Sequence, residues 1–172
     1  MHFVNSWTTP EKRVLVLLSD EVIATFFAYR QDRHQPEAGG ILLGRRRGNH
    51  FEVVLATEPA ATDRRTRVAF VRESHGHQEQ AVEQWERSLG EIGYVGEWHT
   101  HPEVTPLPSP VDIDQWNELP TRSANYAPML GIIVGTQNLC VALLRPNLPH
   151  TTLQPEHGQA PFVPRQQSTP DV

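Results

Sequence analysis

The chain has 172 residues, of which 38% are hydrophobic and 20% charged, so it can form one domain with a substantial core. Its formal net charge of −5 at pH 7 argues against a nucleic-acid-binding protein, and no apolar run approaches the roughly 20 residues that span a membrane. The single cysteine, Cys140, cannot form an internal disulfide, and the chain does not start with an export signal, so we expect a soluble protein of the cytoplasm.

The pattern of apolar residues predicts an irregular lead-in, residues 1–12, followed by strands and helices. In chain order these are strand 14–18, helix 21–29 capped by Ser19 or Asp20, a hairpin of strands 39–44 and 51–56, strand 67–72, helix 74–89, strand 92–100, a helix that begins at Ser109, and a hairpin of strands 129–134 and 139–144. Their irregular alternation indicates an α/β (α+β) fold, a curved mixed β-sheet flanked by helices. We expect one domain over residues 1–146 and an extended or disordered tail over residues 147–172.

The most informative motif of the chain is Glu97-Trp98-His99-Thr100-His101-Pro102. Residues i and i+2 of a strand face the same side, so His99 and His101 present both imidazoles to one point. After seven further residues, Ser109-Pro110-Val111-Asp112 reads as a helix start, with serine as N-cap and proline at the first helical position. Two imidazoles and a carboxylate are ligands that a catalytic zinc takes from protein, so we predict a zinc site at His99, His101 and Asp112.

Hydrolysis at such a site also needs a group that takes the proton of the attacking water. Three glutamates are candidates on the residues alone: Glu37, Glu97 and Glu103. Alternation puts Glu97 on the histidine face of its strand, and Glu103 lies in the loop after the second histidine. Glu37 lies far away in the sequence, where periodicity cannot place it, so the residues leave the identity of the base open.

Two motifs together, Glu37-Ala38-Gly39-Gly40-Ile41-Leu42-Leu43-Gly44 and His99 through Asp112, resemble those of the JAMM (MPN+) zinc metalloproteases. The resemblance spans roughly residues 14–145 and implies zinc held by His99, His101 and Asp112, with Glu37 as general base. It also implies that the hydroxyl of Ser109 donates to the oxyanion of the tetrahedral intermediate, a role compatible with capping the helix through a lone pair. The family hydrolyses amide bonds, mostly isopeptide bonds after the C-terminal glycine of ubiquitin-like proteins.

A narrower resemblance involves Gly76-His77-Gln78, Trp85 and Ser88 before the motif and Ile113-Asp114-Gln115-Trp116 after it. These residues are similar to those of the bacterial JAMM peptidases of CBASS antiphage operons. Such peptidases are encoded beside a cyclic-oligonucleotide synthase (CD-NTase) and an E1–E2 fusion enzyme that joins the synthase to targets. The resemblance therefore implies a CD-NTase or its conjugates as substrate and the E1–E2 enzyme as functional partner. The chain has no room for the insertion that eukaryotic deubiquitinases use after the zinc-binding aspartate, so the loop over residues 58–66 is a candidate for setting specificity.

Two alternatives stay open. A JAMM peptidase with the same chemistry could instead process a ubiquitin-like sulfur-carrier protein or a phage-tail or cell-wall peptide. The chain could also be a non-catalytic MPN scaffold, although such scaffolds usually lack a ligand or the base and all five positions are present here. Of the other residues, we expect Trp98 and Trp116 in the core or along a substrate groove. His75 and His77, about 200° apart on the expected helix, should be exposed or partly packed.

Overall fold

The structure is a computed structural model that describes residues 5–32, 34–73, 75–122 and 126–156 of the chain. Its strands are β1 (Ser6–Thr8), β2 (Leu15–Leu18), β3 (Gly39–Arg47), β4 (His50–Ala56), β5 (Arg64–Arg65), β6 (Phe70–Val71), β7 (Gly93–Thr100), β8 (Met129–Val134), β9 (Leu139–Leu144), β10 (Thr151–Thr152) and β11 (Gln154–Pro155). Its helices are α1 (Asp20–Ala28), α2 (His77–Arg87), α3 (Pro110–Glu118) and the 3-10 helix η1 (Leu119–Arg122). Among the described residues, no helix is both long and apolar enough to cross a membrane.

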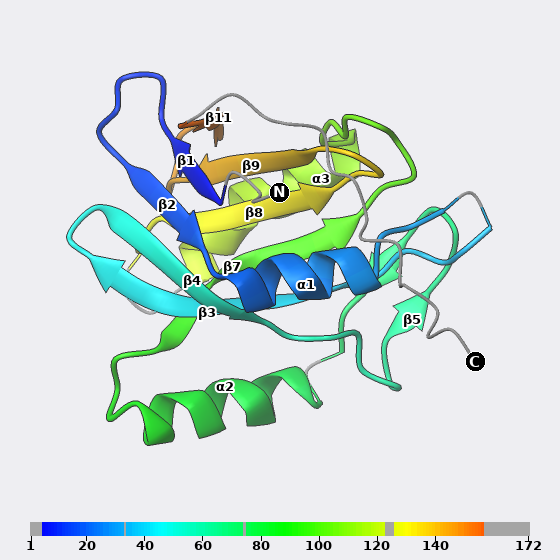
Figure 1. Ribbon diagram of the computed structural model, residues 1–172, viewed down its shortest axis with the longest axis horizontal. Helices are drawn as coiled ribbons and strands as arrows, with labels where there is room; N and C mark the ends of the chain where they lie inside the picture. The colour runs from blue at the N-terminus through cyan, green and yellow to red at the C-terminus, as the bar shows by residue number, and fades with distance from the viewer. Residues whose placement is uncertain (1–4, 33, 74, 123–125, 157–172) are drawn as a thin grey trace, which may run out of the picture.

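Within the described residues, nine strands form one mixed sheet in the order β10-β9-β8-β7-β3-β4-β2-β1-β11, and β5 pairs with β6 in a separate small sheet. Two neighbouring pairs, β2–β4 and β7–β8, are parallel, and the other neighbours are antiparallel. Helix α1 lies in front of the sheet in Figure 1, α3 lies behind β8 and β9, and α2 runs along β3 and β7. The main core fills the space under α1, where the rings of Phe26 and Trp98 lie 5.1 Å apart. The expected α/β fold with a curved sheet flanked by helices is confirmed.

The sheet is so strongly curled that one short C-terminal segment pairs with both of its edges. β10 pairs with β9 and β11 pairs with β1, although only Leu153 separates β10 from β11. The side chain of Leu153 is buried in the core, and its N–H donates to the carbonyl of Val141 (2.8 Å). In the described part of the tail, β10 and β11 therefore belong to the sheet, which continues past residue 146. Residues 157–172 of the expected tail lie outside the described residues.

Two predictions about strands were wrong. The expected irregular lead-in contains strand β1, which pairs with β2. The strand expected over 67–72 is reduced to the two residues of β6, hairpinned with β5. By contrast, Ser19 caps α1 as predicted, because its hydroxyl accepts a hydrogen bond from the N–H of Val22 (3.3 Å).

Helix α2 begins at His77, later than the expected start at residue 74. Its N-cap, Gly76, has a φ of +86°, a conformation that favours glycine, and the side chain of Glu79 accepts from the N–H of Gly76. His77 is fully buried, so the expectation of an exposed or partly packed side chain was wrong. The physical reason is that residues 57–73 fold over the start of α2, which a helical wheel does not show.

Candidate metal centre and active site

Strand β7 brings His99 and His101 together near its end. Between them Thr100, which points to the other face of the sheet, is fully buried, as is Trp98 on the same face. The Nε2 atoms of the two histidines lie 3.1 Å apart, and their ring centroids lie 4.9 Å apart. The pair therefore presents two nitrogen atoms to one point, as the period of a strand predicts.

Asp112 reaches the same point from the first turn of α3. Ser109 caps this helix: its hydroxyl accepts from the N–H of Asp112 (3.2 Å), and its own N–H donates to Asp112 Oδ2 (2.7 Å). The two bonds fix the carboxylate so that Oδ1 lies 3.2 Å from His99 Nε2 and Oδ2 lies 3.4 Å from His101 Nε2. The expected helix start is thus present, and it aims the carboxylate at the histidine pair.

The spacing of these donors fits a zinc ion. Ligands arranged tetrahedrally at about 2.0–2.1 Å from zinc lie about 3.3–3.4 Å from one another. The separations here are 3.1, 3.2 and 3.4 Å. One donor atom from each of His99, His101 and Asp112 can be chosen so that all lie within 4.8 Å of one another. Three protein ligands of this kind leave a fourth position for water or substrate, as catalytic zinc sites require.

Trp116 fixes the position of α3, and with it Asp112 one turn earlier. The indole packs directly over Gly131 of β8, where an added Cβ would lie only 2.5 Å from the ring. The ring is 6% exposed and belongs to a second core cluster behind the sheet. Trp116 and Trp98 are therefore both core residues, and neither is exposed along a groove. A glycine at position 131 is what allows the helix to approach β8 so closely.

Glu37 faces the cluster from the segment that leads into the neighbouring strand, two residues before β3 begins. The antiparallel ladder pairs Gly39 with His99, so continuing the register by two residues puts Glu37 opposite His101 on the same face. The side chain is buried, and burial raises the pKa of its carboxyl, although the electrostatic influence of His99 and His101 opposes this. A carboxyl with a raised pKa beside such a histidine–aspartate cluster suits a group that takes up and returns a proton.

The other two glutamates are engaged elsewhere. Glu97 lies on the histidine face as alternation predicts, but its Oε1 accepts from Arg72 Nη2 (2.5 Å) and from the hydroxyl of Tyr94 (2.8 Å). Glu103 Oε2 lies 3.2 Å from Nδ1 of His101, the nitrogen on the far side of the ring from the cluster. The geometry therefore favours Glu37 among the three candidates for the base.

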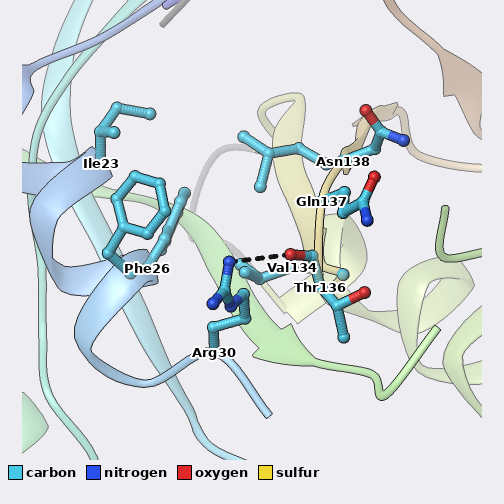
Figure 2. A pocket seen from close by; sticks show the side chains of 10 residues that line it. Ile23, Phe26, Arg30, Val134, Thr136, Gln137 and Asn138 are labelled. Atoms are coloured by element: carbon cyan, nitrogen blue, oxygen red, sulfur yellow. Dashed lines mark hydrogen bonds between the residues drawn. The ribbon is translucent and has the colours of Figure 1, made fainter. Parts of the chain in front are cut away.

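The contact between Glu103 and His101 was not predicted from the sequence, which indicated Glu103 only as a candidate base. A carboxylate on the far nitrogen of a metal-binding imidazole fixes the tautomer and the ring orientation. The backbone of Glu103 is itself held, because its carbonyl accepts from the N–H of Thr136 (2.7 Å) in the β8–β9 turn. Figure 2 shows Arg30 donating in turn to the carbonyl of Thr136 (2.9 Å). The position of Glu103, two residues after His101, was the available signal.

The pocket drawn in Figure 2 lies between α1 and the β8–β9 turn. Its volume of about 30 Å³ has room for one or two water molecules. Ile23, Phe26 and Val134 are among the side chains that line it. The contact that holds the β8–β9 turn here is the hydrogen bond from Arg30 to the carbonyl of Thr136.

The ionised carboxylate of Asp112 favours a positive charge at the point where the three side chains meet. Burial alone raises the pKa of the Asp112 carboxyl, but hydrogen bonds from His101, His99 and Ser109 outweigh it and hold this pKa well below its ordinary range. For His101, burial lowers the pKa of the imidazole, and the bond to Asp112 with the nearby carboxylates raises it by more. A divalent cation bound by the same atoms would satisfy this preference without protonating the imidazoles.

The fold and the site together define a JAB-type domain, and the chain belongs to the Prok-JAB family, the prokaryotic homologs of the JAB domain, whose match covers residues 19–145. A Pseudomonas aeruginosa protein named CD-NTase/cGAS isopeptidase is 39% identical over 145 residues, which are 84% of this chain and 92% of that protein. A Vibrio cholerae protein of the same name is 39% identical over 129 residues, 74% of this chain and 81% of its own length. The fold is also similar to the solution structure of a Desulfitobacterium hafniense protein, with a TM-score of 0.55 and 19% identity over 80% of this chain and 88% of that chain.

Proposed function

We propose that this protein is a zinc-dependent isopeptidase that cuts the amide bond after the C-terminus of a conjugated CD-NTase and so releases the synthase from its targets in antiphage defence. Membership of the Prok-JAB family supports the hydrolytic chemistry, and the names of relatives 36% to 39% identical to this chain support the substrate. The observation that carries the proposal is the convergence of His99, His101 and Asp112 at separations of 3.1 to 3.4 Å, faced by the buried Glu37.

Each residue has a defined part in this proposal. His99, His101 and Asp112 would hold the zinc, which would lower the pKa of its bound water to about 7 and polarise the scissile carbonyl. The carboxylate of Glu37 takes the proton of the attacking water and returns it to the leaving amine. The hydroxyl of Ser109 accepts the helix N–H through a lone pair, so its hydrogen is available to the developing oxyanion.

We infer that the E1–E2 fusion enzyme is the functional partner, because it would form the bond that this enzyme cuts. We also place the reaction in the cytoplasm. The single cysteine, Cys140, is buried and unpaired, which suits a reducing compartment.

The test is a cleavage assay read by intact mass spectrometry. The substrate is a CD-NTase with a foreign protein fused to its C-terminus, and wild-type enzyme is compared with Glu37→Ala after elemental analysis of both. We expect one zinc per chain in each and a cut at the native C-terminal residue by wild type only. A zinc-loaded wild type that makes no cut would reject this substrate and favour a sulfur-carrier or peptide substrate. Glu37→Ala at the wild-type rate would reject Glu37 as the base, and a His99→Ala variant that keeps its zinc would contradict the ligand assignment.

A further inference from the structure

The crossover segment, which we define as residues 57–73, folds back over the start of β3 and holds the backbone of Glu37. The N–H of Glu37 donates to the carbonyl of Thr66 (2.7 Å), and the carbonyl of Glu37 accepts from Arg65 Nε (2.7 Å). Arg65 Nη2 also donates to the carbonyl of Pro36 (3.4 Å). Two consecutive residues of the crossover segment therefore occupy both main-chain polar groups of Glu37.

Glu37 needs this support because strand β3 extends past strand β4 at the site. The β3–β4 ladder begins with Leu42 opposite Ala56, and the last bond between these segments runs from the N–H of Thr57 to the carbonyl of Ile41 (3.0 Å). Glu37 lies four residues before Ile41, so on that side the sheet offers no strand to pair with it. An unpaired buried carbonyl would be costly, and Arg65 supplies the donor that β4 does not.

A buried polar network anchors the crossover segment. Asp63 Oδ2 accepts from the N–H of Ala60 (2.6 Å) and lies 3.0 Å from His77 Nε2, and its Oδ1 accepts from the N–H of Glu73 (2.9 Å). One carboxylate thus ties residues from both ends of the segment to the first residue of α2. The side chains of Asp63 and His77 are both fully buried.

Thr57 extends this network to strand β3. Its Oγ1 accepts from the N–H of Ile41 (2.9 Å) and lies 2.6 Å from Nδ1 of His77. His77 therefore contacts Thr57 through one ring nitrogen and Asp63 through the other. These linked contacts hold the buried part of the crossover segment between β3 and α2.

We propose that Arg65 is a positioning residue, whose guanidinium holds the backbone of Glu37 so that its carboxylate faces the histidine–aspartate cluster; the proposal rests on the role of Glu37 as base proposed above. Arg65 does not touch substrate or metal in this scheme and acts only through Glu37. Displacing a catalytic group by about 1 Å can cost on the order of 100-fold in rate. Removing Arg65 should therefore lower kcat while leaving KM and zinc content near their wild-type values.

Arg64 provides a matched control on the same strand. It carries the same charge one residue earlier, and among the described residues its exposed side chain forms an ion pair with Glu73 at 3.5 Å. We compare Arg65→Ala, Arg65→Lys and Arg64→Ala in the cleavage assay. We expect Arg65→Ala to lose about 10- to 100-fold in kcat, Arg65→Lys to recover part of that loss through one remaining donor, and Arg64→Ala to match wild type.

A second measurement does not depend on turnover. Hydrogen exchange at the amides of Glu37 and Ala38, followed in the zinc-loaded protein, should accelerate at least about 10-fold in Arg65→Ala and stay unchanged in Arg64→Ala. If Arg65→Ala fails to fold, Arg65→Lys decides by the same two measurements.

The proposal would be overturned by an unchanged kcat in Arg65→Ala or by unchanged exchange at both amides. An unchanged kcat with a raised KM would mean that Arg65 contacts the substrate instead. A failure of the proposed function looks different. In that case wild type makes no cut, or Glu37→Ala keeps its rate, whatever the exchange data show for Arg65.

Discussion

Replacing Gly131 by alanine tests whether Trp116 sets the position of Asp112. The added Cβ would lie 2.5 Å from Cε2, 2.7 Å from Nε1 and 2.8 Å from Cζ2 of the indole, closer than carbon atoms approach in folded proteins. The ring cannot simply move aside, because it packs in a buried cluster with Leu119, Met129 and others. Overpacking of this kind costs about 1–3 kcal/mol, which for a chain of this size lowers Tm by about 2–12 °C.

The same clash should weaken zinc binding, since α3 has to shift and Asp112 lies one turn before Trp116 on that helix. The assays are thermal unfolding with zinc chelated and zinc affinity by competition with a chromogenic chelator. Gly93→Ala is the matched control: it is also a strand glycine beside a tryptophan, but the nearest atom, in the half-exposed ring of Trp85, is 3.4 Å away. A Gly131→Ala variant with the Tm and zinc affinity of Gly93→Ala would refute the idea that this contact places the aspartate.

Three further predictions concern the residues around the site. Glu103→Ala should weaken zinc binding by on the order of 10- to 100-fold, because the far nitrogen of His101 loses its partner, and an unchanged affinity in the chelator assay would show that Glu103 does not orient the ring. Trp98→Phe removes the buried bond from Nε1 to the carbonyl of Thr57 (3.1 Å) and should cost about 1–3 kcal/mol in urea unfolding; a loss well below that range would mean that the carbonyl finds another donor. Burial raises the pKa of Glu37 from its ordinary 4.5, so in the metal-free folded state the ionised carboxylate is penalised. Glu37→Gln should therefore raise the Tm of chelator-treated protein at neutral pH, and the gain should fade below about pH 4.5, where the carboxyl is protonated in both states; equal Tm values at pH 7 would contradict a burial penalty.

Features that lie within one strand or one helical turn could be predicted from the sequence. His99 and His101 are two residues apart on a strand, and Ser109 and Asp112 are three apart at a helix start, so period and capping rules fix their relative directions. The structure has both arrangements. The metal-binding and catalytic roles themselves stay predictions until the zinc and cleavage measurements are made.

Features that depend on the register between distant segments could not be predicted from local patterns. Glu37 meets His101 only through the β3–β7 ladder, and the burial of His77 depends on Asp63 arriving from the crossover segment. The short strand β11 has the same cause: it includes Pro155, a residue that patterns exclude from central strands, and it forms at the edge where the curled sheet closes on β1. Without its tertiary partner, each of these segments has no strong local preference.

We expect the crossover segment to link substrate choice to catalysis. The loop over 58–66, where we expect specificity to be set, ends in Arg65 and Thr66, which hold the backbone of Glu37. A change in this loop that suits a new substrate would also move the point at which the proposed base is held. The contact between Asp63 and His77 limits this coupling, because it holds the buried part of the segment against α2. The exposed residues of the loop can then vary without moving that buried part. Substitutions that alter specificity without loss of turnover should therefore fall on exposed positions of the loop such as Ala61 and Thr62 and spare the buried network.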